Sequence, residues 1–188
     1  MLSEKEKSNM ANKTAQRIID QTILKIRSGN YNSISLRKIA KELNLTTGAF
    51  YKYFENKSAL FYRVSIELSK EVAAELKVDQ TQLPFDQLLQ IAQQFCRMFQ
   101  TQPQMMNFLF FNPSLTNFYQ TGNDNFAFFK LIQNLVHEVN PGQLKDQHFF
   151  NQIWSFIQGY ALLISNQITQ YDPQLVKITL KEFTRGDK

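Results

Sequence analysis

The sequence predicts an all-α protein with a small N-terminal helical domain and a larger helical C-terminal domain. Apolar residues recur at the three- and four-residue spacing of amphipathic helices almost throughout, and no alternating strand pattern or hairpin signal occurs. Positive charge is also unevenly spread. Residues 1–77 hold 14 Lys and Arg against 8 Asp and Glu, whereas residues 78–188 hold 7 against 8. We place the two domains at residues 1–57 and 58–188.

The charge asymmetry indicates a polyanion-binding N-terminal part, with a solvated basic surface as the alternative. Apolar runs such as residues 108–111 are far shorter than the roughly 18 residues that a membrane span needs. The charged N-terminus lacks a secretory pattern, and a single cysteine excludes an internal disulfide framework. We therefore expect a cytoplasmic protein that does not contact membranes.

The first two predicted helices follow from apolar stripes and their stop signals. An amphipathic stripe runs from Ala15 to Ile26, and Gly29-Asn30 then predicts a left-handed stop. A short second helix follows, with Ser35 as its N-cap. Its inner face comprises Leu36, Ile39, Ala40 and Leu43.

A tight turn separates the second helix from a third. Asn44 tolerates the left-handed backbone that such a turn requires. Thr46 is then the cap of a third helix that reaches about Tyr53, and Asn56 caps a fourth from Lys57 to about Lys77.

The rest of the chain also consists of predicted helices. After a loop at 78–84, an apolar face from Phe85 to Phe99 marks one long helix. Proline and glycine then divide the remainder. The predicted helices are 104–111, 114–120, 124–139, 145–170 and 174–185.

The second and third helices, joined by about three residues, have the arrangement of a helix-turn-helix. Arg37 and Lys38 lie in the first turn of the second helix, and Lys57 opens the fourth. Cations at a helix N-terminus oppose the helix dipole, so they make sense if a phosphate binds there. This placement favours nucleic acid over a merely solvated surface.

The third helix divides into an inner and an outer face. Phe50 and Phe54 are four residues apart and are expected to pack inward. Thr47, Gly48, Tyr51 and Lys52 are expected to face outward, together with the polar tip of Tyr53. Gly48 would let a partner approach the backbone closely, and tyrosine and lysine can contact phosphates or base edges.

Residues 33–61, SISLRKIAKELNLTTGAFYKYFENKSALF, resemble the DNA-binding signature of the tetracycline-repressor (TetR) family of bacterial regulators. With the first helix, the resemblance covers about residues 13–62. The matching residues are Ser35, Arg37, Ile39, Ala40, Leu45, Thr46, Gly48, Phe50, Tyr51, Phe54, Lys57 and Leu60. Asn44 replaces the turn glycine of the family pattern, and Tyr53 stands where histidine is commonest.

The resemblance implies a homodimer that binds a pseudo-palindromic operator in double-stranded DNA. Residues matching the DNA contacts of the family are Arg37, Thr47, Ala49, Tyr51, Lys52, Tyr53 and Lys57. We include Ser35, Thr46 and Gly48 in the predicted DNA-binding set. The resemblance also implies a ligand pocket in the C-terminal domain, dimerisation through the last two long helices, and a ligand that weakens operator binding.

The C-terminal domain is rich in Phe and Met, which form either core or pocket walls. Residues 154–163 resemble a Trp-x-x-x-His-Gly element of some family members, with Gln158 in place of the histidine. Trp154 and Gln158 then share one helical face, although Gln158 can equally be a satisfied core amide. The predicted ligand-binding residues are Phe99, Met106, Phe110, Trp154 and Gln158, and their character favours an apolar or a cationic effector.

Catalytic and metal-binding patterns are not recognisable. His137 and His148 are separated by a Pro-Gly turn and lack the spacing of a zinc site, and Cys96 on an apolar face is expected to be buried and inert. We predict no cofactor and no enzyme. The predicted function is a DNA-binding transcriptional regulator, a repressor that a small effector releases. The alternative is a regulator whose C-terminal domain binds a protein partner or only dimerises.

Overall fold

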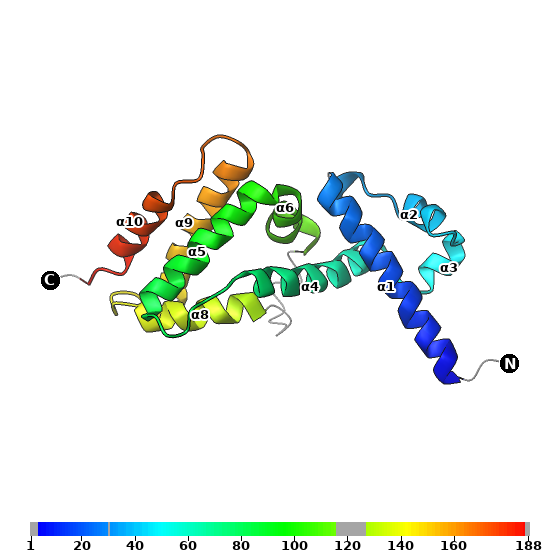
Figure 1. Ribbon diagram of the computed structural model, residues 1–188, viewed down its shortest axis with the longest axis horizontal. Helices are drawn as coiled ribbons and strands as arrows, with labels where there is room; N and C mark the ends of the chain where they lie inside the picture. The colour runs from blue at the N-terminus through cyan, green and yellow to red at the C-terminus, as the bar shows by residue number, and fades with distance from the viewer. Residues whose placement is uncertain (1–3, 30, 116–126, 187–188) are drawn as a thin grey trace. The chain divides into compact units, whose positions relative to one another are not determined.

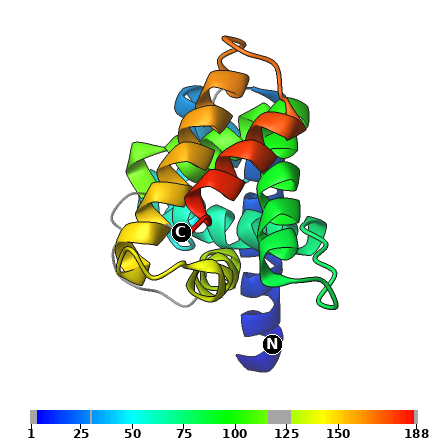
Figure 2. The same ribbon diagram turned by 90° about the vertical axis from the view of Figure 1, so that its left-hand side faces the viewer.

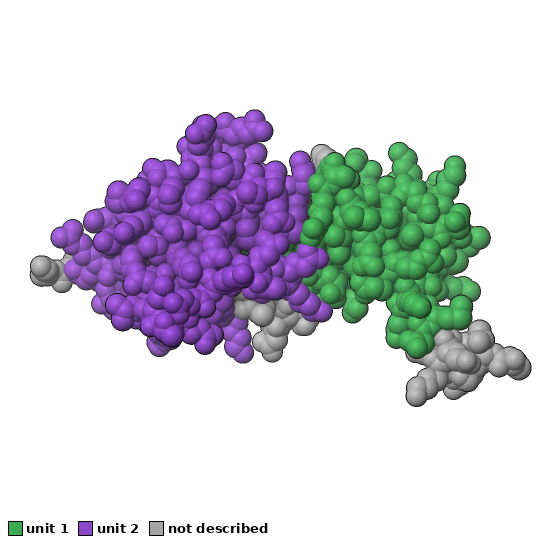
Figure 3. Space-filling view, viewed as in Figure 1, with its two compact units in different colours: residues 1–68, 107–123 green, residues 69–106, 124–188 purple. Residues whose placement is uncertain are grey.

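The computed structural model describes residues 4–29, 31–115 and 127–186, and every regular element within these ranges is a helix (Figure 1). The prediction of an all-α fold is thereby confirmed. By their contacts, residues 1–68 and 107–123 form one compact unit, and residues 69–106 and 124–188 form a second (Figure 3). The predicted functional boundary between residues 57 and 58 stays a prediction.

The first unit is built on the N-terminal helices, in which α1 packs against α2 and α2 against α3. The elements are α1 (Glu4–Ser28), the 3-10 turn η1 (Tyr31–Ser33), α2 (Leu36–Glu42), α3 (Thr47–Tyr51) and the first part of α4 (Lys57–Glu75). The apolar stripe of α1 supplies Ile18, Ile19 and Ile26 to the core, where all three are fully or almost fully buried.

Two helix ends in this unit differ from the sequence prediction. Gly29 does not adopt a left-handed backbone, because α1 closes with a tighter bond from the Gly29 N–H to the Ile26 carbonyl at 3.4 Å. Asn30 lies outside the described residues. Helix α3 ends at Tyr51 rather than Tyr53. The Lys52 and Tyr53 N–H groups donate to the carbonyls of Ala49 and Phe50, three residues back, so the last turn is a 3-10 turn.

The second unit is a helical body arranged around α5. Its elements are the end of α4, α5 (Pro84–Thr101), the start of α6 (Pro103–Phe111), α8 (Ala127–Val139), α9 (Asp146–Ser165) and α10 (Pro173–Phe183). Helix α5 contacts α8, α9 and α10, and Figure 2 shows α10 lying alongside both α5 and α9. Phe95, Phe99, Phe149, Ile153 and Leu180 are buried in this body.

The predicted helix at 145–170 is five residues too long at its C-terminal end. Helix α9 stops at Ser165 because Gln167 adopts a left-handed backbone with a φ of 58°. The Ile168 N–H then bonds the Leu163 carbonyl at 2.9 Å and the Gln167 N–H bonds the Ile164 carbonyl at 3.0 Å, which together form a Schellman motif. Glutamine seldom adopts this backbone, so the sequence carries no recognisable stop there.

The predicted helix at 114–120 begins instead as a 3-10 turn, η2 (Pro113–Leu115), and its remainder falls outside the described residues. Residues 124–126 of the helix predicted at 124–139 also lie outside them. No helix in the described ranges is both long enough and apolar enough to cross a bilayer.

Candidate nucleic-acid interface

The turn between α2 and α3 has the geometry of a helix-turn-helix, and Asn44 is its pivot. Asn44 has a φ of 56°, as predicted from its tolerance of the left-handed region. The Leu45 N–H bonds the Ala40 carbonyl at 2.8 Å, and the Asn44 N–H bonds the Lys41 carbonyl at 3.1 Å. These bonds form a second Schellman motif, which ends α2 and turns the chain into α3.

Helix α3 is fixed at its start by a cap and at its inner face by two rings. The Thr46 hydroxyl accepts a hydrogen bond from the Ala49 N–H at 3.1 Å, so the predicted cap is confirmed. Phe50 and Phe54 are buried with ring centroids 6.2 Å apart, and Ile39 of α2 is fully buried as well. Because Phe50 and Phe54 fix the inner face of α3 against the core, the outer face of α3 also has a defined position.

The outer face of α3 consists of exposed Thr47, Gly48, Tyr51 and Lys52. A Cβ atom added at Gly48 would have nothing within 4 Å apart from its chain neighbours and the backbone of its own helix, and Gly48 does not have a left-handed backbone. The fold therefore has no need of glycine there, although glycine costs a helix about 1 kcal/mol relative to alanine. The open space over Gly48 fits a partner that approaches the helix backbone.

Ala49 and Tyr53 are half-buried, so the structure places Tyr53 less far outward than the sequence predicted. Tyr53 lines a hollow of about 360 Å³ together with Ile19 of α1 and Arg63 of α4. The narrow last turn of α3 turns Tyr53 toward this hollow. Among the α3 aromatics, Tyr51 is therefore the one with the largest free surface, at 46% exposure.

Exposed cations lie at the start of α2. Arg37 and Lys38 are exposed in its first turn, which contains no acidic residue. Ser35 has the extended backbone of an N-cap, but its hydroxyl makes no capping hydrogen bond. The first N–H groups of α2 thus lack the side-chain partner that a cap usually provides, and they lie beside two positive charges. This is the arrangement that a phosphate group complements.

Lys57 is more deeply engaged with its own chain than the sequence suggested. Its ammonium donates a hydrogen bond to the Asn32 carbonyl at 3.2 Å and lies 5.0 Å from the centroid of the Phe61 ring. Partial burial lowers the pKa of Lys57. The lysine therefore links η1 to the start of α4, and the remaining ammonium protons are the part that it can offer to DNA.

The opposite end of α2 is attached to α1. Lys25 and Glu42 form an ion pair of 2.7 Å, and the Gln21 amide donates to the same carboxylate at 2.8 Å. The bonds from Lys25 and Gln21 lower the pKa of Glu42. Lys25 is consequently neutralised within the protein. Among the described residues, Arg37 and Lys38 form no such close ion pair, although the charge of Lys38 also acts on Glu42.

A ring cluster that the sequence did not reveal involves Tyr31, which packs edge-on against Phe108 of α6 at 5.6 Å and Phe61 of α4 at 6.5 Å between ring centroids. The Tyr31 hydroxyl donates to the Phe111 carbonyl at 3.4 Å, and burial raises the Tyr31 pKa. These contacts attach the end of α6 to the N-terminal helices. No local sequence pattern could pair residues so far apart in the chain.

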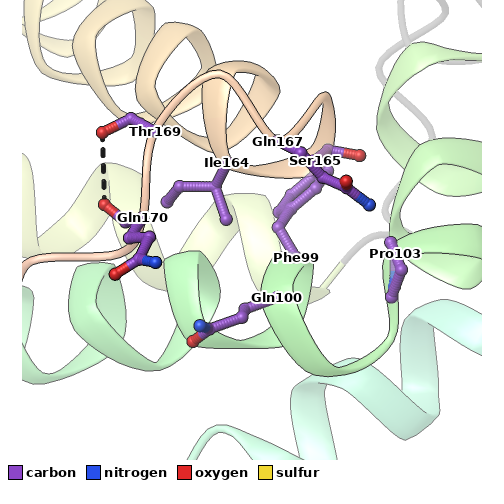
Figure 4. A pocket seen from close by; sticks show the side chains of 8 residues that line it. All are labelled: Phe99, Gln100, Pro103, Ile164, Ser165, Gln167, Thr169 and Gln170. Atoms are coloured by element: carbon purple, nitrogen blue, oxygen red, sulfur yellow. Dashed lines mark hydrogen bonds between the residues drawn. The ribbon is translucent and has the colours of Figure 1, made fainter.

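The structure does not gather the five predicted ligand-binding residues into one site. Trp154 is half-buried against Phe95, with ring centroids 5.3 Å apart, and Gln158 lies one turn further along α9. Phe99 and Met106 are buried in the second unit, whereas Phe110 belongs to the first. Of the five, only Phe99 lines the hollow drawn in Figure 4.

The titratable groups of the described residues meet the needs of neither a metal site nor a reactive thiol. Among the described residues, no three His, Cys, Asp or Glu side chains are grouped closely enough to hold a metal ion. Cys96 is fully buried, and burial raises the pKa of its thiol to about 12. A thiol with so high a pKa is not a reactive nucleophile at neutral pH.

A capped, exposed α3 that follows a tight turn, with two exposed cations at the start of α2, is the arrangement of a helix-turn-helix DNA-binding regulator. The family comparison agrees, because residues 18–64 match the family described as "Bacterial regulatory proteins, tetR family". The match covers the N-terminal helix-turn-helix part of the chain, which is similar to the DNA-binding domain of that family. No curated protein matches the sequence.

Solved structures support the same fold over nearly the whole chain. The fatty acid degradation regulator FadR from Bacillus halodurans aligns with a TM-score of 0.64 and 17% identity, over 92% of this chain and 95% of that one. A TetR-family regulator from Haemophilus influenzae gives 0.55 and 21%, over 93% and 96%. NalD, the secondary repressor of the MexAB-OprM multidrug efflux pump in Pseudomonas aeruginosa, gives 0.59 and 17%, over 93% and 94%.

Proposed function

We propose that the protein is a homodimeric repressor that binds a pseudo-palindromic operator and is released from it by a small-molecule effector. The observation that carries the DNA-binding part is the outer face of α3, where Gly48 opens the backbone between Thr47 and Tyr51. Such a helix can enter the major groove, where base edges are distinguishable.

In this proposal the residues of the interface divide into two roles. Arg37 and Lys57, with the hydroxyls of Ser35 and Thr46, hold phosphates and fix the register of the protein on the duplex. Thr47, Ala49, Tyr51 and Lys52 reach bases or the adjacent backbone, and Tyr53 contacts the flanking phosphate from its half-buried position. Gly48 allows the close approach on which these contacts depend.

Exposed apolar residues on α9 and α10 support the proposed homodimer. Helix α9 buries one face of apolar residues in its own unit, yet it also exposes Leu162 and Leu163. Helix α10 buries Val176 and Leu180 and exposes Ile178 on another face. Helices that are apolar on two faces are expected to be covered on both, and a second copy of α9 and α10 would provide that cover.

A regulator without a small-molecule ligand, whose C-terminal domain binds a protein or only dimerises, is the second candidate. It is favoured by the complete burial of Met106, which leaves none of that side chain's surface for a ligand. The names of the similar structures refer to fatty acid degradation in one case and multidrug efflux in another, so they do not agree on one effector.

The proposal is tested first at Gly48. Sites are selected from random double-stranded DNA, and affinity is then measured by fluorescence anisotropy. Because a Cβ at residue 48 meets open space and leucine favours a helix more than glycine does, Gly48→Leu should keep or raise the free energy of unfolding. It should lower operator affinity at least about tenfold, a loss of about 1.4 kcal/mol. A Gly48→Leu protein that is folded and binds as tightly as the wild type contradicts the proposed recognition surface.

The phosphate contact is tested by salt dependence. Arg37→Gln should weaken binding to all sequences and reduce the slope of log K against log salt by about 1. Lys130→Gln, which removes an exposed charge from α8, is the matched control and should leave the slope unchanged. An unaltered slope for Arg37→Gln contradicts its assigned role.

A further inference from the structure

A hollow of about 370 Å³ lies in the second unit where α5 and α9 both end. Figure 4 shows its lining: Phe99 and Gln100 come from α5, Ile164 from α9, and Gln167, Thr169 and Gln170 from the loop that follows α9. We call these residues the glutamine hollow. Its volume is at the lower end of the range of small-molecule sites, about 300–1,000 Å³.

The wall of the glutamine hollow is a fixed loop. The left-handed Gln167 ends α9, and its Schellman bonds turn the chain back. The Tyr160 hydroxyl then donates to the Gln170 carbonyl at 3.0 Å and accepts from the Asp172 N–H at 2.7 Å. One buried tyrosine thereby fastens both sides of the loop segment that carries Gln170. The backbone of this part of the lining is therefore held by the protein's own contacts.

The polar groups of the glutamine hollow are amides with unused hydrogen-bonding capacity. Within the described part of the chain, the side-chain amides of Gln100, Gln167 and Gln170 make no hydrogen bond. Each amide offers two donors and one acceptor. Ile164 and the edge of Phe99 add apolar surface between them (Figure 4). A ligand that combines hydrogen-bonding groups with an apolar portion matches this lining.

The electrostatics of the hollow disfavour an anion. No ionisable side chain is among its lining residues. Helices α5 and α9 end at Thr101 and Ser165, so each presents the partially negative end of its dipole near the hollow. A carboxylate placed there would lose hydration without gaining a cation. An uncharged ligand loses far less.

We propose that the glutamine hollow binds an uncharged organic molecule with an amide or hydroxyl group attached to a small ring or short apolar chain. Its regulatory meaning rests on the proposed effector response, since it names the effector class for that response. Binding itself can be measured without DNA, so the site and the operator function are tested separately.

The decisive probes are benzamide and benzoate, which have the same size and shape but differ in charge. In ligand-observed NMR titrations, benzamide should bind with a Kd of about 1–10 mM, as expected for so small a probe. Benzoate should bind at least about tenfold more weakly, because it places an anion at two helix C-termini. Trp154 gives a second readout, since its ring is joined to Phe99 through Phe95 at centroid spacings of 5.3 and 5.2 Å.

Variants locate the binding. The double variant Gln100→Ala with Gln170→Ala should raise the benzamide Kd at least about fivefold, because it removes two of the three free amides. Gln152→Ala is the matched control: it removes an exposed glutamine about 18 Å along α9 from Ile164 and should leave the Kd unchanged.

Three results would overturn the site: no benzamide binding at about 20 mM, benzoate binding as tightly as benzamide, or an unchanged Kd in the double variant. If benzamide binds as expected but leaves operator affinity unchanged at saturation, the site is supported and only its part in operator release is contradicted. Failure of the protein to bind operator without any probe would contradict the proposed function and leave the measured benzamide affinity standing.

Discussion

At the scale of single residues, Asn44 shows how one side chain sets the geometry of the helix-turn-helix formed by α2 and α3. Its φ of 56° is the bend that ends α2 and allows Thr46 to start α3 two residues later. Asparagine enters this backbone region more readily than other non-glycine residues because its short polar side chain can hydrogen-bond locally. The angle between α2 and α3 therefore depends on the backbone preference of residue 44.

This dependence predicts how substitutions of Asn44 change stability. Asn44→Ala should lower the free energy of unfolding by about 1 kcal/mol, because alanine is strained in the left-handed backbone conformation. Asn44→Gly should stay within about 0.5 kcal/mol of the wild type, because glycine adopts this conformation without strain. Urea unfolding followed by circular dichroism measures both. Equal stability of the alanine and glycine variants would show that residue 44 carries no such strain.

Residues whose role depends on local spacing were predictable from the sequence. The burial of Phe50 and Phe54 and the exposure of Thr47, Tyr51 and Lys52 follow from the helical period alone. Lys57 was less predictable, since its bond to the Asn32 carbonyl depends on how η1 folds back onto α4. The packing of Tyr31 on Phe108 joins residues that are distant in the chain, and the helical periodicity of the sequence does not predict such contacts.

At the scale of elements, helix starts were more predictable than helix ends. Caps such as Thr46, Asn56 and Asp172 accept hydrogen bonds from the backbone N–H groups of their helices, and each is a residue type that favours this position. The end of α9 depends on Gln167, a residue type that rarely takes a left-handed backbone. The glutamine hollow results from that ending, so it too was hidden from a sequence prediction.

The junction between α8 and α9 is held by a polar cluster around Asp146. Its carboxylate accepts hydrogen bonds from the Asn140 amide at 2.7 Å and lies 2.6 Å from Nδ1 of His137. The side-chain oxygen Oδ1 of Asn140 in turn accepts from the Gly142 N–H at 3.1 Å, and Gly142 has a φ of 88°, which suits glycine. The bond from Asn140, followed by that from His137, lowers the pKa of Asp146.

The second prediction follows from the sign of this shift. A carboxyl whose pKa is lower in the folded than in the unfolded state adds stability that is fully present above the unfolded value, here 3.8, and is lost as the pH falls through the lower folded value. Asp146→Asn should therefore unfold with a weaker dependence on pH below about 4 than the wild type. Urea unfolding at pH 7, 4 and 3 makes the comparison. An identical pH dependence in the two proteins would contradict the role of the cluster.

At the scale of the whole molecule, the proposed function depends on two helix-turn-helix units held by one dimer. A single α3 contacts few base pairs, so high affinity for a two-part operator requires that the second helix-turn-helix unit be held near its own half-site. The surface proposed to hold the two copies together consists of Leu162 and Leu163 on α9 with Leu175 and Ile178 on α10, all of which are exposed in one chain.

The third prediction tests this surface. Leu163 is 41% exposed and Ile178 is 58% exposed, so the double variant Leu163→Glu with Ile178→Glu should fold as the wild type does. In a dimer the same residues would be buried against a second copy, where four added carboxylates lose hydration and repel one another.

Light scattering should therefore find the double variant monomeric, and its operator affinity should fall at least about a hundredfold because the second helix-turn-helix unit is no longer tethered. Leu83→Glu is the control, since Leu83 is even more exposed but lies before α5, away from the proposed surface. It should remain dimeric and bind operator normally. A folded double variant that stays dimeric would mean that α9 and α10 do not form the interface, and the two helix-turn-helix units would have to be joined through another face.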